Sequence, residues 1–465
     1  MNKKLKIVLI TIAAAIVLVI AAIVIASLVK PAEQTEVTPP PVVADTAAPS
    51  EEPEETPDET PEHVNTVTST LAVGGDIVMH TGLNGEAAGD TGYDYVPIFG
   101  ILKDFIANAD YSVCSLVTTF SEGTNYTAYP LFKSPTDLAA SIAEVGFNLV
   151  NTATSHCVDS YKDGIDYTLD TLDAAGLDHV GTYRTQEERG ASGNRFMADI
   201  NGINVAFLAY TCDTNNVPIA GFEYAASVCA VDYLSGGTEI DYDLMKGDLA
   251  AAKEAGADIV FVFMSWGTEF ATQPTDQQYE IADFLFENGA DIIIGGHCRV
   301  PQPMELRTVK DADGNERTGF ICYSLGNMLS CQNDEYTDIS ALVNIQLTKD
   351  TDTGETWISD VSYKPIYMAD LYDYGINDYG WHYRMVDLHA AINSYESGSP
   401  WDFITDEVYR DMKDALDAVH EFFGADLDSA VKDAGDTADA ETTPAAETPR
   451  RRCGVSLSAP REPGG

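Results

Sequence analysis

Basic residues are scarce in this chain. Its 465 residues include 26 lysines and arginines against 74 aspartates and glutamates, which gives a formal net charge of −48 at pH 7. A surface this acidic repels the phosphates of nucleic acids and the headgroups of anionic lipids. We therefore exclude nucleic acid as a partner, and we expect the chain to work outside the cell or among cations.

The chain also lacks any cysteine spacing that indicates pairing. Eight cysteines are present, but no local spacing between them is typical of a disulfide framework. An extracytoplasmic compartment permits disulfides, although a domain of this size does not need them. The sequence therefore leaves their redox state open. It shows no internal repeat either.

An uncharged run follows the lysine-rich start of the chain. Residues 1–6 carry three lysines, and residues 7–29 carry no charge. At ~1.5 Å per residue a helix of this length spans roughly 34 Å, enough to cross a bilayer. A cleaved signal peptide has an apolar core of only ~7–15 residues, so the length favours an uncleaved anchor. We expect a single-pass protein of the cell membrane, with residues 1–6 cytoplasmic and the main domain extracytoplasmic.

Two low-complexity segments flank the predicted folded part. Residues 30–66 are rich in proline, threonine and acidic residues, with almost nothing to bury, and are expected to form a disordered, extended stalk. Residues 428–465 begin with a similar composition and then turn basic, and we expect a disordered tail there. Residues 67–427 are predicted to form one folded domain.

Strand and helix patterns alternate through that domain. Two apolar runs meet at Asn201-Gly202, which is a strong hairpin signal. The helical pattern at residues 163–175 ends at Gly176, a usual helix stop. After about residue 300 the pattern changes to antiparallel hairpins, one around Asp313-Gly314 and one around residues 352–354. Parallel βα units and hairpins in one chain predict an α/β fold with two mixed sheets packed face to face and helices outside.

Five loops follow predicted strands and contain candidate site residues. A metal centre needs carboxylate, amide and imidazole ligands that converge from separate strand ends. A lone histidine is more often a packed or surface residue, but several such loops in order are stronger evidence. The loops contain Asp76 and His80; Cys114 to Phe120; His156 and Asp159; Trp266 and Glu269; and His297 and Arg299.

The order and spacing of these loops resemble the CapA family of poly-γ-glutamate capsule-synthesis proteins, over about residues 68–335. The matching positions are Gly75-Asp76, His156 with Asp159 and Gly164, Trp266-Gly267 with Glu269, Gly295 and His297, Val300, Gln302-Pro303, and the intact YSLGN at 323–327.

This resemblance implies a calcineurin-like metallophosphatase fold, an αββα sandwich of two mixed sheets, here preceded by one transmembrane helix. It also implies roles for particular residues. The metal ligands would be Asp76, His156, Glu269 and His297, and the two histidines would also be catalytic. Further ligand-binding residues would be Arg299, Asp159, Trp266 and Asn327.

Several positions depart from the family's pattern. Asn-Leu-Glu reads Ser115-Leu116-Val117, Asn-Asn-His reads Thr154-Ser155-His156, and the expected histidines at 265 and 299 are serine and arginine. Hydroxyls are poor metal ligands, valine is none, and a guanidinium adds a fixed positive charge. We expect a site unable to hold two ions. It keeps ligands for one divalent ion of unknown identity, or binds an anion at Arg299.

The resemblance implies a role in the biosynthesis or export of an anionic surface polymer, within a membrane complex for capsule synthesis, with catalysis reduced or lost. Two alternatives stay open. One is an active metal-dependent hydrolase of phosphoesters or of the polymer's amide bonds, and the other is an extracytoplasmic anion-binding module. Cys114, Cys157 and Cys298 lie in the same loops, so a thiolate–imidazole zinc site is a further hypothesis, but we favour cysteine as a small apolar filler.

Overall fold

The computed structural model describes residues 65–100, 102–310, 314–376 and 381–433. The predicted cytoplasmic start, the anchor and nearly all of the stalk lie outside the described residues. Among the helices that are described, none combines the length and the apolar character that a bilayer span requires.

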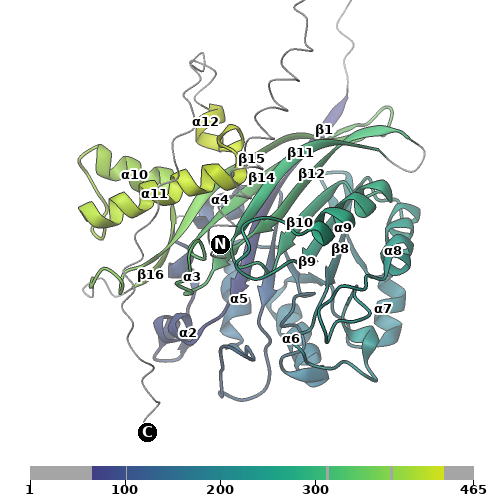
Figure 1. Cartoon of the computed structure of the whole chain (residues 1–465), viewed down its shortest axis with the longest axis horizontal. Coiled ribbons are helices and arrows are strands. Elements are labelled where there is room, and N and C mark those ends of the chain that lie inside the picture. The colour runs from purple at the N-terminus through teal and green to yellow at the C-terminus, as the bar shows by residue number, and fades with distance from the viewer. Residues whose placement is uncertain (1–64, 101, 311–313, 377–380, 434–465) are drawn as a thin grey trace, which may run out of the picture. The chain divides into compact units, whose positions relative to one another are not determined.

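The described residues form two large mixed sheets (Figure 1). The eight-stranded sheet has the order β16-β15-β14-β1-β4-β5-β6, with β13 also paired to β1, and the six-stranded sheet has the order β11-β12-β10-β9-β8-β7. The strands of the first sheet are β1 (Thr66–Val78), β4 (Tyr111–Val117), β5 (Leu149–Asn151), β6 (Asp178–Val180), β13 (Asn327–Leu329), β14 (Ile339–Asp350), β15 (Thr356–Asp370) and β16 (Tyr383–Asp387). Those of the second are β7 (Arg195–Ile200), β8 (Ile203–Thr211), β9 (Ile259–Ser265), β10 (Ile292–Gly296), β11 (Pro301–Lys310) and β12 (Glu316–Leu325).

The two sheets face each other across a shared apolar core. Leu71 of β1, Phe207 of β8 and Phe261 of β9 are fully buried members of one cluster. The Ser69 hydroxyl of β1 donates a hydrogen bond of 2.7 Å to the Ile200 carbonyl of β7. Both sheets are thus held together by burial and by a direct bond between their strands, and the predicted mixed α/β fold is confirmed.

Helices cover the outer face of each sheet because their apolar residues recur on one side. Helices α4 (Leu102–Asn108), α5 (Asp137–Glu144) and α6 (Tyr161–Ala175) pack on the eight-stranded sheet, and α8 (Tyr242–Glu254) and α9 (Asp276–Glu287) pack on the six-stranded sheet. The apolar positions are three or four residues apart, the spacing of one helix face: Leu138 and Ile142 of α5, Leu169 and Leu172 of α6, Met245 and Leu249 of α8, and Ile281 and Leu285 of α9.

The bounds of the helices and of the short strand pair complete the architecture. They are α2 (Thr81–Ala87), β2 (Ala88–Gly89), β3 (Gly92–Tyr93), α3 (Val96–Phe99), α4 (Leu102–Asn108), α5 (Asp137–Glu144), α6 (Tyr161–Ala175), α7 (Gln186–Ser192), the 3-10 turn Glu223–Ala225, α8 (Tyr242–Glu254), α9 (Asp276–Glu287), α10 (Leu388–Glu396), α11 (Asp406–Phe423), the 3-10 turn Ala425–Leu427 and α12 (Ser429–Asp433).

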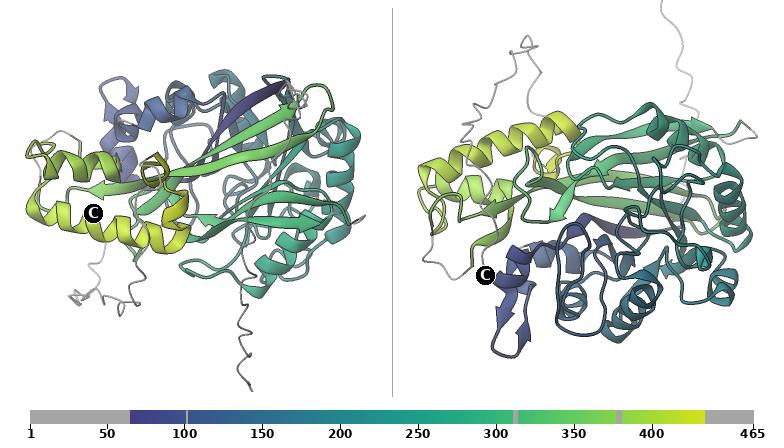
Figure 2. Two further views of the ribbon diagram at one scale, coloured as in Figure 1. Left: turned by 90° about the horizontal axis from the view of Figure 1, so that it is seen from above. Right: turned by 60° about the horizontal axis from the view of Figure 1, so that its bottom comes forward.

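Helices α10 and α11 lie side by side at one end of the sheets, where Figure 2 shows them in yellow-green. Met412 and Val419 of α11 belong to the core between the sheets. The chain then continues into Asp428, which is fully buried, and into α12. The predicted start of the tail at residue 428 is therefore wrong, because residues 428–433 belong to the fold.

Local signals in the sequence predicted several turns correctly. Asn201 and Gly202 have φ angles of +55° and +89° and connect β7 to β8, as a two-residue hairpin requires. Gly176 ends α6 with φ +77°. Strands β11 and β12, and then β14 and β15, pair as the two predicted antiparallel hairpins.

Candidate functional site

The predicted site loops converge at the carboxyl ends of parallel strands from both sheets. Strands β1, β4 and β5 are parallel neighbours, and so are β8, β9 and β10. The loops after β4, β5, β8, β9 and β10 line a cleft of about 650 Å³. Six of its lining residues matter here, namely Ser155, His156, Asp213, Asn215, Glu269 and His297.

An irregularity in β1 turns Asp76 toward the second sheet. Leu71 belongs to the core between the sheets, whereas Ile77, also odd-numbered, belongs to the core on the opposite face. The pairing register shifts between Val73 and Asp76. Side chains alternate strictly along a regular strand, so this shift moves the even-numbered Asp76 onto the inner face. There its carboxylate accepts a hydrogen bond of 2.9 Å from the backbone amide of His297.

The loop after β10 is tightly built around this carboxylate. A Cβ at Gly296 would lie 2.5 Å from Asp76 Oδ1, so only glycine fits there without displacement. His297 and Arg299 have φ angles of +80° and +66°, which non-glycine residues rarely adopt. Such strain persists only where surrounding contacts enforce it, and it concentrates at functional sites.

His297 lies at the wall of the cleft. Its Nδ1 is 3.2 Å from the Ser155 hydroxyl, and its Nε2 is 3.9 Å from the Asp213 carboxylate. Burial lowers the pKa of His297, although the Asp213 charge acts in the opposite direction. The imidazole is therefore favoured in its neutral form, which is the form that binds metals or accepts protons.

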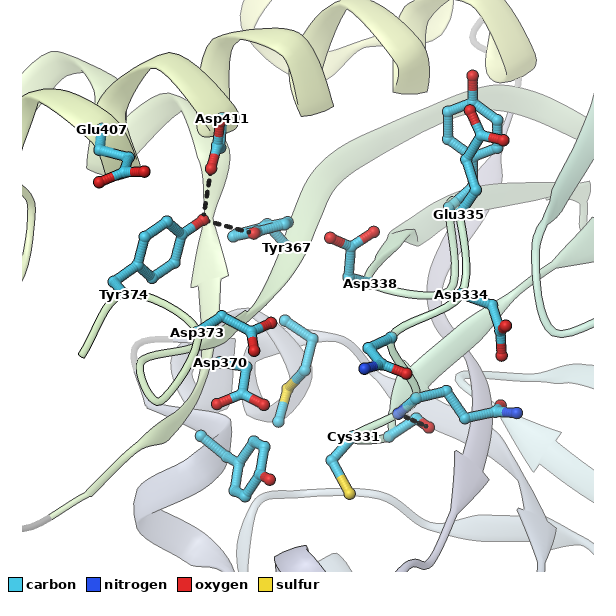
Figure 3. Close-up of a pocket in the computed structure, with 16 residues that line it drawn as sticks. Cys331, Asp334, Glu335, Asp338, Tyr367, Asp370, Asp373, Tyr374, Glu407 and Asp411 are labelled. Carbon is cyan, nitrogen blue, oxygen red and sulfur yellow. Dashed lines mark hydrogen bonds between the residues drawn. The ribbon is translucent and has the colours of Figure 1, made fainter. Parts of the chain in front are cut away.

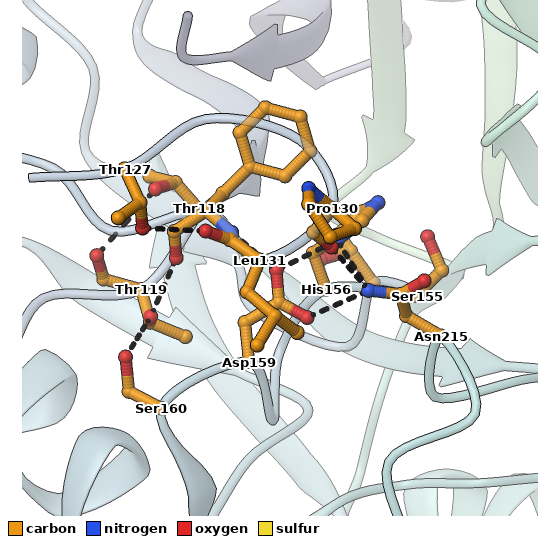
Figure 4. Close-up of polar contacts among 12 residues, drawn as sticks. Thr118, Thr119, Thr127, Pro130, Leu131, Ser155, His156, Asp159, Ser160 and Asn215 are labelled. Atoms are coloured by element: carbon orange, nitrogen blue, oxygen red, sulfur yellow. Dashed lines mark hydrogen bonds and ion pairs between the residues drawn. The ribbon is translucent and has the colours of Figure 1, made fainter. Parts of the chain in front are cut away.

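His156 forms a buried dyad with Asp159 (Figure 4). The His156 Nδ1 is 2.7 Å from Asp159 Oδ2. The Asn215 amide bridges both side chains, at 3.3 Å from His156 Nδ1 and 3.1 Å from Asp159 Oδ1, and it donates to the Pro130 carbonyl at 2.7 Å. A carboxylate on one ring nitrogen fixes the orientation of the imidazole. Asp159, predicted to bind a ligand, therefore positions His156.

Arg299 is buried beneath the cleft. Its side chain is only 3% exposed, and its Nε donates to Glu269 Oε1 at 3.2 Å, while Glu269 itself is 44% exposed. The Arg299 Nη1 is buried without a hydrogen-bond partner. Arg299 is absent from the cleft lining, so the predicted direct anion contact at its guanidinium is not available in this arrangement. The positive charge of Arg299 therefore acts on neighbouring buried residues and not through direct contact with a ligand.

The positive charge of Arg299 affects the pKa values of two buried neighbours. Burial raises the pKa of Asp76, and the positive charge of Arg299 opposes this rise. Burial and the same charge lower the pKa of His80 to about 4. Burial is thus the main reason that the His80 imidazole is favoured in its neutral form, and the charge of Arg299 adds to it while favouring the ionised form of Asp76.

Two other predicted ligand-binding residues are enclosed by protein. Trp266 is fully buried, and its indole N–H donates to the Tyr323 carbonyl at 2.9 Å. Trp266 therefore packs in the protein interior and does not face a ligand. Asn327 is opposite Asp76 in the register of β13 with β1. Its Nδ2 donates to Gln332 at 2.9 Å, and its Oδ1 is buried without a partner.

The arrangement does not fit a pair of metal ions. Within residues 65–100, 102–310, 314–376 and 381–433, one trio of histidine, cysteine or acidic residues has ligand atoms within 4.8 Å of one another, and it lies outside the cleft. Asp76, His156, Glu269 and His297 are brought to the same region but not to one point. Glu269 pairs with Arg299, and Asp76 accepts from a backbone amide.

The three loop cysteines behave as buried filler. Cys114, Cys157 and Cys298 are all buried. Burial raises the pKa of each thiol, that of Cys298 to about 12, which disfavours the thiolate that binds zinc. The favoured prediction for these cysteines therefore agrees with their placement.

Two cleft residues were missed from the sequence. Asp213 and Asn215 follow β8, whose apolar run was predicted, but the loop after it was not included among the candidate loops. The signal was present, because a carboxylate and two amides directly follow a buried strand in "CDTNN".

A second cavity of about 320 Å³ lies below α11 (Figure 3). Its lining is strongly acidic and includes Asp334, Asp370, Asp373, Glu407 and Asp411. Burial raises the pKa of Asp370, as expected when carboxylates are crowded away from water. A cavity of this charge repels an anionic ligand.

Comparison with known proteins identifies the family. The model of the family described as "Bacterial capsule synthesis protein PGA_cap" matches residues 70–332. The capsule biosynthesis protein CapA of Bacillus anthracis is 27% identical over 286 residues, which cover 60% of this chain and 64% of that protein. The PGA biosynthesis protein CapA of Bacillus subtilis is 30% identical over 208 residues, which cover 45% of this chain and 49% of that protein. The chain thus matches less than two thirds of either relative's length.

Two solved structures are also similar. A phosphatase from Mycoplasma pneumoniae has a TM-score of 0.37 at 12% identity, covering 65% of this chain and 95% of the other. A purple acid phosphatase from yellow lupin seeds has a TM-score of 0.25 at 10% identity, covering 63% of this chain and 53% of the other.

The resemblance to CapA proteins predicted from the loop motifs is confirmed by the family model and by both relatives. The chain belongs to the bacterial capsule synthesis protein family PGA_cap.

Proposed function

We propose that this chain is a membrane-anchored protein that takes part in the biosynthesis or export of an anionic surface polymer of the poly-γ-glutamate type, within a membrane complex. Family membership and the two relatives named for capsule or PGA biosynthesis support the polymer. The uncharged run at residues 7–29 supports the anchor. We further propose that the cleft serves binding or assembly, with metal-dependent catalysis reduced or lost.

One observation carries the loss of the metal pair: a buried arginine beneath the cleft. Arg299 pairs with Glu269 and raises the positive potential around Asp76. A guanidinium does not deprotonate in a protein, so its charge repels a second cation at every accessible pH. Arg299 holds one oxygen of Glu269 and the His297 amide holds one oxygen of Asp76, so a bridging ion would compete with these donors.

The cleft lining combines hydroxyl, amide and imidazole groups of Ser155, Asn215 and two histidines with the carboxylates of Asp213 and Glu269. An anionic polymer would therefore meet both polar donors and like charge at this opening. The rest of the molecule is acidic and repels a polyanion unless salt or cations screen the charge. Contact with the polymer would therefore be local and salt-dependent.

The proposal is tested in the cell that makes the protein. Deletion of its gene is expected to lower the amount of anionic polymer at the cell surface, and the wild-type chain is expected to restore it. The His179→Gln variant is also expected to restore the polymer, because His179 pairs with Asp173 outside the cleft. Unchanged surface polymer after deletion would contradict the proposed role.

The rival function is metal-dependent hydrolysis, and the oriented His156–Asp159 dyad favours it. Its test is turnover of a phosphodiester or of poly-γ-glutamate by the purified full chain, with and without added Mn²⁺ or Zn²⁺. We expect no metal-stimulated turnover. Stimulated turnover that His297→Ala abolishes would establish the hydrolase and overturn the proposed loss of catalysis.

A further inference from the structure

A second cluster of ligating side chains lies on the helical end of the fold. His389 of α10 and His420 of α11 both point their Nε2 atoms at Asp428 Oδ2, at 2.6 Å and 2.7 Å. All three ligand atoms lie within 4.8 Å of one another. These residues are not among those that line the cleft.

The cluster is supported from several sides. Asp428 follows the 3-10 turn Ala425–Leu427 and forms a β-bridge with Tyr363 of β15. Its other carboxylate oxygen accepts a hydrogen bond of 2.9 Å from the Ala430 amide. Backbone contacts therefore hold this carboxylate in place independently of the two histidines, as outer-sphere contacts hold a metal ligand.

The exposure of the three residues differs in a useful way. The Asp428 side chain is fully buried, and the side chains of His389 and His420 are each 25% exposed. A buried carboxylate and two partly exposed imidazoles thus meet at one point that has a side open to solvent.

We propose that His389, His420 and Asp428 form a zinc site, with solvent in the fourth position. Two imidazole nitrogens and one carboxylate oxygen are a donor set that zinc takes in proteins, and calcium and magnesium prefer oxygen ligands. The imidazoles exchange their hydrogen bonds to Asp428 for bonds to the ion, and the protons on Nε2 leave or move to Nδ1. The ion joins α10, α11 and the segment that pairs with β15.

The geometry also assigns the consequence of binding. Helix α11 contributes Met412 and Val419 to the core between the sheets. An ion that binds only the folded arrangement stabilises it by mass action. Zinc is therefore expected to raise the thermal unfolding midpoint of the whole domain, and binding is expected to weaken toward acid pH because protons compete for the imidazoles.

The test uses the full chain, purified in detergent without a polyhistidine tag, reduced and stripped of metal. Titration calorimetry with ZnCl₂ is expected to show one equivalent bound and CaCl₂ none, with a rise in the unfolding midpoint. His389→Gln and His420→Gln keep a hydrogen-bond donor toward Asp428 and are each expected to weaken zinc binding at least about 10-fold. His179→Gln, which removes another carboxylate-paired histidine, is expected to bind as the wild type does.

Two outcomes would overturn the site. One is the absence of stoichiometric zinc binding by the wild-type chain, which would leave the trio as a hydrogen-bonded clamp. The other is zinc binding that both glutamine variants retain, which would place the ion on other residues such as the histidines and carboxylates of the cleft. If a glutamine variant unfolds without metal, Asp428→Asn takes its place, and zinc binding that this variant retains would likewise place the ion on other residues.

Discussion

Replacement of Arg299 by methionine tests the role of the buried charge. Methionine has a similar length and keeps much of the packing, but it removes the guanidinium. The lost pairing with Glu269 contributes less than about 1 kcal/mol, because Glu269 is 44% exposed. The larger loss concerns Asp76, which is buried and whose ionised form the charge of Arg299 favours. Breaking a directly paired buried ion costs about 3–5 kcal/mol, and Arg299 acts on Asp76 through its charge alone, so we expect a smaller loss of about 1–3 kcal/mol at pH 7.5.

The loss is expected to depend on pH in a defined direction. Without Arg299, burial raises the pKa of Asp76 further above its unfolded value. The folded variant then binds a proton that the unfolded chain does not, over the interval between those two pKa values. Stability in that interval rises as pH falls, so the deficit of Arg299→Met relative to the wild type is expected to shrink between pH 7.5 and pH 5.

Urea unfolding at both pH values measures this effect. Arg307→Met is the matched control, because Arg307 pairs with Asp283 and Glu305 at the surface, and it is expected to cost less than about 1 kcal/mol at either pH. A double-mutant cycle with Asp76→Asn is expected to show coupling above about 1 kcal/mol. An Arg299→Met variant that is as stable as the wild type, or a deficit that pH leaves unchanged, would refute the reasoning.

Three further predictions concern the same fold. Because the pKa of His80 is lowered to about 4, the folded chain loses stability relative to the unfolded chain as pH falls from ~6.5 to ~4. His80→Gln is expected to remove about 3 kcal/mol of that acid sensitivity, and unfolding curves of both proteins across this range would show no difference if His80 were unimportant. Gly296→Ala is expected to lower the free energy of unfolding in urea by about 1–3 kcal/mol, because its Cβ meets the Asp76 carboxylate. Gly247→Ala, in open space on α8, is expected to raise it by up to ~1 kcal/mol. Equal effects of the two substitutions would contradict the close approach at Gly296. Met412→Ala is expected to cost about 2–5 kcal/mol by thermal or urea unfolding, and a neutral result would mean that α11 does not close the core.

The periodicity of the sequence predicted the parts of the fold that local physics determines. Apolar runs such as residues 292–294 became central strands, and Asn201-Gly202 became a tight turn because its residues tolerate positive φ. The loops after those strands gathered at one edge, since parallel strands share the direction of their carboxyl ends. For this reason Asp76, His156 and His297 were found in one region.

The parts that were missed depend on contacts distant in sequence. The burial of Arg299 and its pairing with Glu269 follow from the positive φ of the loop and from the packing of two strands, which no local pattern reports. The segment after residue 427 has the composition of a tail, but Asp428 is retained in the fold by His389 and His420 from two separate helices. Local composition cannot indicate a partner that lies about forty residues earlier.

The direct test of the central claim is anomalous diffraction from crystals of the protein grown with Mn²⁺ or Zn²⁺. Because the positive charge of Arg299 repels a second cation, we expect no pair of ions between Asp76 and His297. Two well-occupied anomalous peaks about 3.5–4 Å apart at that position would contradict the account.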